Sequence, residues 1–164
     1  MQRIVVMGVS GSGKTSVGQA LAARLGIAFT DADDLHPAAN VEKMRAGHPL
    51  TDEDRWPWLD RVGRKLADAA PGVVACSALK RSYRDRIRAA CGAPVRFVHL
   101  SGSRDQIAAR MAARTDHYMP VSLLDSQFAT LEPPGADEAL ILGIDAPVDT
   151  LVDRIANHLE GQTT

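Results

Sequence analysis

The sequence predicts an α/β fold in which a mostly parallel sheet is flanked by helices. Two observations support this prediction. Short apolar runs alternate with helical patterns, and a Gly-rich turn joins the first apolar run to the first helix. The hydrophobic content, 45% of 164 residues, is ordinary for a soluble globular protein. We expect one domain over residues 1–164, because about 100–200 residues form a domain that holds its own core.

The first strand is predicted over residues 3–7, where the apolar run reads as a buried strand. The helix that follows is predicted over residues 14–25, because apolar side chains recur at helical spacing and Gly26 is a natural C-terminal signal. Further short apolar runs are bounded by turn residues. These strands are expected at residues 27–30, 73–76, 95–100 and 139–144.

A second helix is predicted after the acidic stretch 52–54. We expect Pro57 in its first turn, where proline is tolerated, and an end near Ala70. Two later helices follow from a Ser-x-x-Gln capping box and from an amphipathic pattern near the end of the chain. They are expected from Ser103 with Gln106 through Arg114, and over residues 148–159.

Composition excludes several function classes. Lys and Arg number 19 and Asp and Glu 20, which leaves a net charge of −1, so neither nucleic acid nor an anionic membrane is an expected partner. No apolar run approaches the about 18 residues of a membrane span, and the apolar start is too short for a signal peptide. Cys76 and Cys91 fit neither a zinc pattern nor a disulfide scaffold, so we expect a reduced, cytoplasmic compartment.

The segment GVSGSGKT, residues 8–15, fits G-x-x-x-x-G-K-[ST] at every constrained position. Glycines let backbone N–H groups wrap phosphates, and the following helix adds the partial positive charge of its N-terminus. Lys14 would reach the β- and γ-phosphates of ATP, and the Thr15 hydroxyl would bind Mg²⁺. A strand before and a helix after favour this interpretation over a chance Gly/Ser turn. The expected ATP contacts are Gly8, Val9, Ser10, Gly11, Ser12, Gly13, Lys14, Thr15 and Ser16.

A nucleotide-binding loop alone does not distinguish an enzyme from a switch. A GTPase would carry Asn-Lys-x-Asp late in the chain, and the sequence has none. Motor and AAA-type ATPases are usually longer and have an apolar strand that ends in an acidic pair. Residues 141–145 resemble that strand only superficially, because they follow every other predicted strand. A small-molecule kinase is the remaining common use of so compact a chain.

Carboxylates follow the second predicted strand, where parallel strands present their ends to a ligand crevice. Asp31 and Asp33 share a face if the segment is extended, so they could orient an acceptor hydroxyl or hold Mg²⁺ through water. Asp34 would point away and cap a helix. The alternative that all three are caps or turn residues stays open. His36 either contacts substrate or is structural.

Cations gather over residues 80–88, after the third predicted strand. Lys80 and Arg84 lie four residues apart at the start of a helix, and we expect them to bind an anionic substrate. Arg55 is another candidate substrate cation. A solvated helix face is the alternative for part of these charges. The neighbouring tryptophans, Trp56 and Trp58, are expected to be packing residues.

A lid is predicted over about residues 111–125. Arg110 and Arg114 lie four residues apart at a helix end, before a polar segment that returns to residues 121–131. A helix–loop–helix with two arginines suits a lid, because arginine stabilises charge on the transferring phosphoryl group and closure excludes water. Ordinary surface arginines are the alternative, and His117 is either a lid contact or a surface residue.

Beyond the phosphate loop, the sequence resembles the bacterial gluconate kinases (gluconokinases), a family of P-loop small-molecule kinases. The resemblance spans about residues 3–160, and only Tyr118 and Thr15 depart from the commoner Phe and Ser, without loss of the chemistry. The phosphate loop itself discriminates little among P-loop kinases. More specific are DADDLHP at 31–37, PLTDEDR at 49–55, PWL at 57–59, CSALKR at 76–81 and YRD at 83–85; HYM, SQF, LE and ADE follow at 117–119, 126–128, 131–132 and 136–138.

The resemblance implies transfer of the γ-phosphate of ATP to the 6-hydroxyl of D-gluconate, with Mg²⁺, to give 6-phospho-D-gluconate and ADP. It also implies a P-loop NTPase fold like that of nucleoside monophosphate kinases, with a five-stranded parallel sheet in the order 2-3-1-4-5, and a homodimer. Catalytic roles are expected for Lys14, Asp33, Asp31, Arg110 and Arg114. Substrate contacts are expected from Asp33, His36, Arg55, Lys80 and Arg84.

Asp33 is the expected acceptor for the hydroxyl proton. Asp31 is the second choice, or a water-mediated partner of Mg²⁺. Two alternatives to a gluconokinase stay open: a shikimate kinase-like or other small-molecule kinase, and a regulatory module that binds ATP without transferring phosphate. The LHP, PLTDEDR and CSALKR segments are not signatures of shikimate kinases.

Overall fold

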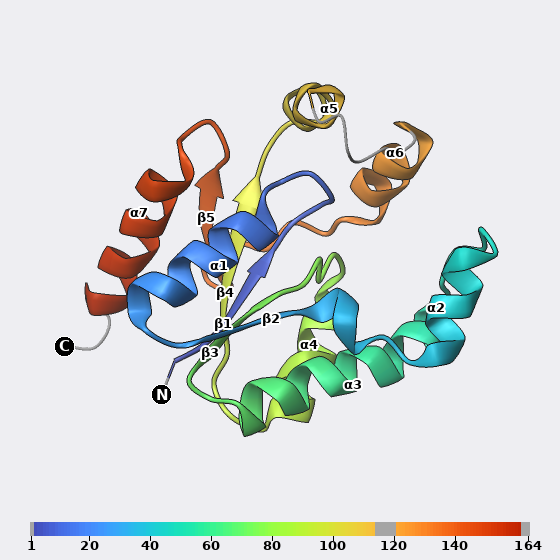
Figure 1. The fold of residues 1–164 in the computed structure, drawn as a ribbon, viewed down its shortest axis with the longest axis horizontal. Coiled ribbons are helices and arrows are strands. Elements are labelled where there is room, and N and C mark those ends of the chain that lie inside the picture. Colours follow the sequence, from blue (N-terminus) through green and yellow to red (C-terminus); the bar gives the residue numbers. More distant parts are fainter. Residues whose placement is uncertain (1, 114–120, 162–164) are drawn as a thin grey trace.

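The computed structural model describes residues 2–113 and 121–161. A central sheet lies between two groups of helices, as Figure 1 shows. The sheet has five strands in the order β2-β3-β1-β4-β5, and every neighbouring pair is parallel. Both the fold class and the strand order predicted from the sequence are therefore confirmed.

Each strand lies within one residue of its predicted bounds, because the apolar runs are short and end at turn residues. β1 is central, and its Val5 pairs with Val74 of β3 on one side and Phe97 of β4 on the other. The strands are β1 Arg3–Met7, β2 Ala28–Asp31, β3 Gly72–Ala75, β4 Arg96–Ser101 and β5 Ala139–Gly143.

Helices α1 and α7 cover one face of the sheet, and α3 and α4 cover the other (Figure 1). Helices α5 and α6 lie beyond the carboxyl ends of the strands, and α2 projects to one side. The bounds are α1 Lys14–Leu25, α2 Ala38–Arg45, α3 Asp52–Asp68, α4 Arg81–Cys91, α5 Arg104–Ala112, α6 Val121–Thr130 and α7 Val148–Gly161, with a 3-10 turn η1 over Ala32–Leu35.

Two helix termini follow the sequence signals closely. Gly26 ends α1 in the left-handed conformation, with φ 69°. Ser103 and Gln106 form the predicted capping box of α5. The Ser103 hydroxyl accepts from the N–H of Gln106, and the Gln106 side-chain oxygen accepts from the N–H of Ser103.

The predicted start of α3 is wrong, because a second capping box was not recognised. The Thr51 hydroxyl accepts from the N–H of Asp54, and the Asp54 carboxylate accepts from the N–H of Thr51. The helix therefore begins at Asp52, and Pro57 lies inside it rather than in its first turn. Proline at this position leaves the carbonyl of Glu53 without its usual helical donor.

Helices α3 and α4 pack closely at Gly63. A Cβ on this residue would lie 2.6 Å from the Cβ of Ala90 and 2.6 Å from the carbonyl oxygen of Ile87. Only glycine allows the two helices to approach this far, so Gly63 sets their separation.

Five connections leave the carboxyl edge of the sheet. They are the phosphate loop after β1, η1 after β2, the loop to α4 after β3, the loop to α5 after β4 and the loop to α7 after β5. In parallel α/β sheets this edge binds ligands. Within the described residues, no helix is long and apolar enough to cross a membrane.

Candidate active site

The phosphate loop, residues 8–15, depends on its glycines. Gly8, Gly11 and Gly13 have φ values of 153°, 81° and 96°, which other residues rarely adopt. A Cβ on Gly11 would lie 2.9 Å from the Cγ of Met111 and 3.1 Å from the Cγ2 of Ile107. Helix α5 therefore rests directly on the loop and leaves no room for a side chain at Gly11.

Lys14 lies inside this loop. Its Nζ donates to the carbonyl oxygen of Val9 at 3.2 Å. Burial lowers the pKa of Lys14, while the charges of Asp33 and Asp31 act in the opposite direction. The ammonium and the two aspartates therefore interact electrostatically, and the structure brings together the residues that the sequence placed at the ends of β1 and β2.

Asp31 and Asp33 lie at the start of η1 rather than on an extended segment. One oxygen of Asp31 accepts from the N–H of Asp33 at 2.9 Å, and the other accepts from the hydroxyl of Thr15 at 3.4 Å. Asp31, not Asp34, is the cap, so the predicted role of Asp34 is wrong. Capping accounts for one oxygen of Asp31 and leaves the other facing the phosphate loop.

The pKa of Asp33 is raised. Desolvation by the surrounding protein is the main cause, repulsion from Asp31 adds to it, and Lys14 opposes it. A carboxylate with a raised pKa is a stronger base than an ordinary aspartate, which suits a group that accepts a proton.

The oxygens beside the loop fit a magnesium ion. Mg²⁺ prefers oxygen ligands and usually takes one or two from the protein and others from phosphates and water. Thr15 and Asp31 offer a hydroxyl and a carboxylate 3.4 Å apart. Among the residues described here, no group of three or more His, Cys, Asp or Glu side chains forms a metal cage, and Mg²⁺ with ATP needs none.

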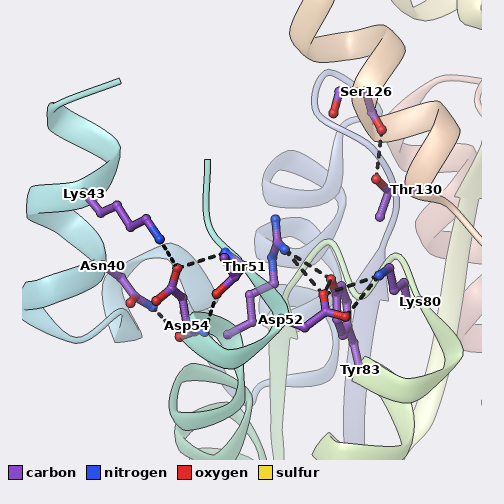
Figure 2. Close-up of polar contacts among 10 residues, drawn as sticks. Asn40, Lys43, Thr51, Asp52, Asp54, Lys80, Tyr83, Ser126 and Thr130 are labelled. Atoms are coloured by element: carbon purple, nitrogen blue, oxygen red, sulfur yellow. Dashed lines mark hydrogen bonds and ion pairs between the residues drawn. The ribbon is translucent and has the colours of Figure 1, made fainter. Parts of the chain in front are cut away.

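A second polar cluster surrounds Asp52, the first residue of α3 (Figure 2). Its carboxylate accepts from Lys80 Nζ at 3.1 Å and from the Tyr83 hydroxyl at 2.5 Å, and it lies 3.7 Å from an Arg55 nitrogen. The bond from Tyr83, then that from Lys80, lowers the pKa of Asp52. One carboxylate thus holds two of the three predicted substrate cations, Arg55 and Lys80. The cluster, residues 52, 55, 80 and 83, keeps a positive charge in excess.

His36 stacks on Trp58, with ring centroids 4.2 Å apart, and its Nδ1 lies 3.3 Å from the side-chain nitrogen of Asn40. Burial, and then the charge of Arg55, lowers the pKa of His36. Trp58 is buried, and its indole N–H donates to the carbonyl of Ala32 in η1. The prediction that Trp58 packs rather than binds is confirmed, and Trp58 also supports the turn that carries Asp33.

Arg84 does not lie in the crevice. Its side chain is 1% exposed, and its nitrogens donate to the carbonyls of Ala78, Leu79 and Glu132 and to both carboxylate oxygens of Glu138. Every guanidinium nitrogen is used inside the protein. The structure thus contradicts the prediction that Arg84 binds an anionic substrate.

The Arg84 network supports the loop between β3 and α4. Ala78, whose carbonyl accepts from Arg84, has a φ of 46°, which is uncommon for a residue with a side chain. Burial raises the pKa of Glu138, but hydrogen bonds from Arg84 and Arg88 outweigh it and hold that pKa below its ordinary value. The network fixes the backbone beside Lys80, which is a structural role for Arg84.

Arg110 lies on α5 above the phosphate loop. It donates to the carbonyl of Ile144, and one of its nitrogens is 3.7 Å from the position of a Cβ on Gly13. Arg110 is thus placed beside the loop, as expected of a residue near phosphates. Arg114 and His117 lie outside the described residues, as does the central part of the predicted lid.

Sequence reasoning missed three polar side chains that organise these groups: Asp52, Gln127 and Glu138. Gln127 of α6 bonds Ser10 of the phosphate loop at two points. Each of the three has partners far away in the chain, such as Lys80 for Asp52, and no local pattern identifies these. Only their membership of the TDED, SQF and ADE segments marked them at all.

Comparison with known proteins agrees with this geometry. The AAA domain family matches residues 4–134. The chain is 46% identical to a gluconokinase of Gluconobacter oxydans, over 97% of this chain and 92% of the relative. It is 50% identical to the thermosensitive gluconokinase of Escherichia coli, over 88% of this chain and 79% of the relative.

Solved structures give the same result. A gluconokinase from Sinorhizobium meliloti superposes with a TM-score of 0.86 at 47% identity, covering 99% of this chain and 98% of that one. A shikimate kinase from Aquifex aeolicus, at 17% identity and a TM-score of 0.63, shares the fold alone, over 99% of this chain and 98% of its own. On the strength of the close relatives and the phosphate loop, the chain belongs to the gluconokinase family.

Proposed function

We propose that the protein is a gluconokinase that transfers the γ-phosphoryl group of ATP to the 6-hydroxyl of D-gluconate, giving 6-phospho-D-gluconate and ADP. One observation carries the proposal. The phosphate loop follows β1, and Lys80 follows β3 at the same edge of the sheet. There Lys80 joins Asp52 and Arg55 of α3 in a cluster, residues 52, 55, 80 and 83, with an excess positive charge. The loop suits ATP, and the cluster suits the carboxylate of a sugar acid.

In the proposed reaction, the 6-hydroxyl oxygen attacks the γ-phosphorus and the bond to the bridging β–γ oxygen breaks. The hydroxyl proton passes to the carboxylate of Asp33, whose raised pKa favours that transfer. Lys14 neutralises charge on the γ-phosphoryl oxygens, and Arg110 supports the loop beside them. Because phosphoryl transfer is loose, positioning and charge stabilisation contribute more than the base.

Arg55 and Lys80 would bind the gluconate carboxylate, with His36 on a hydroxyl. Asp52 holds both cations in place, so that the substrate meets them already oriented. Arg84 has no part in this contact, since its guanidinium is used inside the protein.

We propose Mg²⁺ as the metal, held by the ATP phosphates and the Thr15 hydroxyl, with Asp31 acting through water. When bound, the ion neutralises charge on the phosphates. We propose a lid over about residues 111–125, with Arg110 and Arg114 as its arginines, whose moving part ends where Leu124 packs in the core. Helix α5 already rests on the phosphate loop at Gly11, which supports a lid hinged at that helix.

A homodimer in the cytoplasm is also proposed. Cys76 and Cys91 are both buried free thiols, which fits a reducing compartment. Light scattering on the purified protein tests the oligomeric state, and a monomer at micromolar concentration would overturn the dimer.

The experiment that tests the function is a coupled ADP-release assay with gluconate, with shikimate and without acceptor. We expect ADP release that depends on gluconate, and ³¹P NMR of the product should show a phosphomonoester on carbon 6. Shikimate-dependent release would favour the other kinase class. ATP binding without any acceptor-dependent ADP would favour the regulatory module and overturn the proposal.

A further inference from the structure

Gln127 of α6 makes a two-point contact with the phosphate loop. The N–H of Ser10 donates to its side-chain oxygen at 2.6 Å, and its side-chain nitrogen donates to the Ser10 hydroxyl oxygen at 3.0 Å. Both ends of the carboxamide are therefore used on one residue that lies 117 positions away in the sequence. Such a pair fixes orientation as well as distance, because neither bond can form if the amide rotates.

Helix α6 is firmly seated where it carries Gln127. Leu124 is 1% exposed and packs in the same core cluster as Val9 and Ile107, and Phe128 packs against that cluster. The contact is thus made from a helix held in place by apolar packing. Gln127 itself is half-buried, which shields its bonds to Ser10 from competing water.

The chain directly after α6 holds the other side of the site. The N–H of Glu132 donates to the carbonyl of Leu79 at 2.8 Å, and its carboxylate accepts from the N–H of Arg81 at 3.1 Å. Leu79 and Arg81 flank Lys80, which belongs to the Asp52 cluster. Residues 127–132, which we call the strap, therefore contact the phosphate loop at one end and the Lys80 loop at the other.

We propose that Gln127 is a positioning residue, and that through it the strap holds the phosphate loop in register with the loop that binds the acceptor. The proposal rests on the proposed function for the identity of the acceptor. Phosphoryl transfer depends on alignment, and a misplacement of about 1 Å can lower the rate about 10²-fold. The N–H of Ser10 donates to Gln127 and is therefore not available to a phosphate. The phosphates must bind to N–H groups of later loop residues and of the first turn of α1, which have no helical acceptor.

A kinetic series on the purified enzyme tests the proposal. Gln127→Ala removes both bonds, and we expect kcat to fall by up to about 10²-fold, while KM for ATP and for gluconate each change much less. Gln127→Glu keeps the length, and its carboxylate can accept from both the N–H and the hydroxyl of Ser10. We expect it to recover most of kcat but to raise KM for ATP, because its charge repels the phosphates.

Three further variants give the matched controls. Ser10→Ala removes only the hydroxyl, so it should lower kcat less than Gln127→Ala, and the double variant should be no worse than Gln127→Ala alone. Asp153→Asn weakens a polar contact outside the strap and the site, the exposed ion pair between Asp153 of α7 and Arg24 of α1, and should leave kcat unchanged. Thermal unfolding confirms that each variant is folded.

Binding of a non-hydrolysable ATP analogue with and without gluconate gives a second readout. If the strap joins the two ends of the site, gluconate changes the Kd of the analogue in the wild type by a coupling factor. Gln127→Ala should bring this coupling factor closer to one. A kcat within twofold of wild type in Gln127→Ala, or an unchanged coupling factor, would overturn the inference. If the wild type releases no ADP in response to gluconate, the proposed function is overturned instead. Failure of the positioning role and failure of the proposed function therefore give different results.

Discussion

Every nitrogen of the Arg84 guanidinium donates to a group inside the protein, and its carboxylate partner Glu138 is 3% exposed. Replacing Arg84 by Met would leave a buried carboxylate with Arg88 alone. We expect Arg84→Met to lower the free energy of unfolding by about 3–5 kcal/mol, as is usual when one member of a buried ion pair is removed. Urea unfolding measures this loss. An unchanged stability together with a raised KM for gluconate would restore the substrate role.

Lys14 and Asp33 are expected to contribute unequally to catalysis. Lys14→Ala removes charge from the phosphoryl group in transfer and should lower kcat about 10²–10³-fold. Asp33→Asn should cost less, because a loose transition state needs little help from a base. Steady-state kinetics on both variants checks the order. Near wild-type kcat in Lys14→Ala would contradict the site assignment.

The pH dependence follows from the raised pKa of Asp33. The carboxylate accepts a proton only when it is ionised, so kcat/KM should fall as the pH drops through a pKa above the ordinary aspartate value of 3.8. In Asp33→Asn this acid limb should disappear. A pH–rate profile of wild type and variant measures it, and an acid limb that persists in the variant would assign it to another group.

For single residues, the sequence predicts a role well when a motif fixes the spacing between neighbouring residues. Lys14 and Thr15 were assigned because the motif sets their positions along the chain. Arg84 was assigned wrongly, because its partner Glu138 lies 54 residues away and its burial depends on that partner. A charge on a helix looks the same in a sequence whether it faces solvent or a buried carboxylate.

Between elements, the contact of α3 with α4 depends on Gly63. In Gly63→Ala the new methyl group would meet the backbone of α4, with the Ile87 carbonyl 2.6 Å from the Cβ, and backbone cannot move aside as a flexible side chain can. We expect a loss of about 1–3 kcal/mol in the free energy of unfolding. Gly92→Ala is the comparison variant. An added Cβ there meets no atom within 4 Å, but φ is 69°, so this variant shows the effect of backbone strain without a clash. Chemical denaturation of both variants separates the two effects.

Element prediction was accurate where one signal dominates. The strands followed from apolar runs, and α1 and α5 from their caps. Pro57 as a first-turn signal places the start of α3 too late, because the Thr51–Asp54 capping box lies upstream and begins the helix at Asp52. Helix α2 was not predicted, since it buries little beyond Asn40 and carries almost no apolar periodicity.

For the whole molecule, substrate binding should stabilise the fold. A ligand at about 100 times its Kd adds about 2.7 kcal/mol, which in a chain of this size raises Tm by about 5–10 °C. We expect this shift with a non-hydrolysable ATP analogue and Mg²⁺. Lys14→Ala should abolish most of it, while Arg84→Met should keep it from a lower starting Tm. Differential scanning calorimetry measures both, and an equal shift in Lys14→Ala would remove Lys14 from the nucleotide site.

The overall topology could be predicted from the sequence because the elements were clear and the family resemblance supplied the strand order. The arrangement of the acceptor side could not. Lys80 and Arg55 meet only because Asp52 lies at the first residue of α3, which depends on where that helix begins. An error of a few residues at one helix terminus was enough to conceal the carboxylate that holds both cations.

The position of β1 at the centre of the sheet has a consequence for synthesis on the ribosome. This strand emerges first, yet its two neighbours, β3 and β4, begin only at Gly72 and Arg96. Its apolar residues therefore stay unpaired until β3 has been made, and its second edge stays open until β4 has been made. Parallel pairing over such sequence separations is slow and leaves the nascent chain open to aggregation. The same central position that places the phosphate loop in the middle of the site thus delays the pairing of the strand that precedes it.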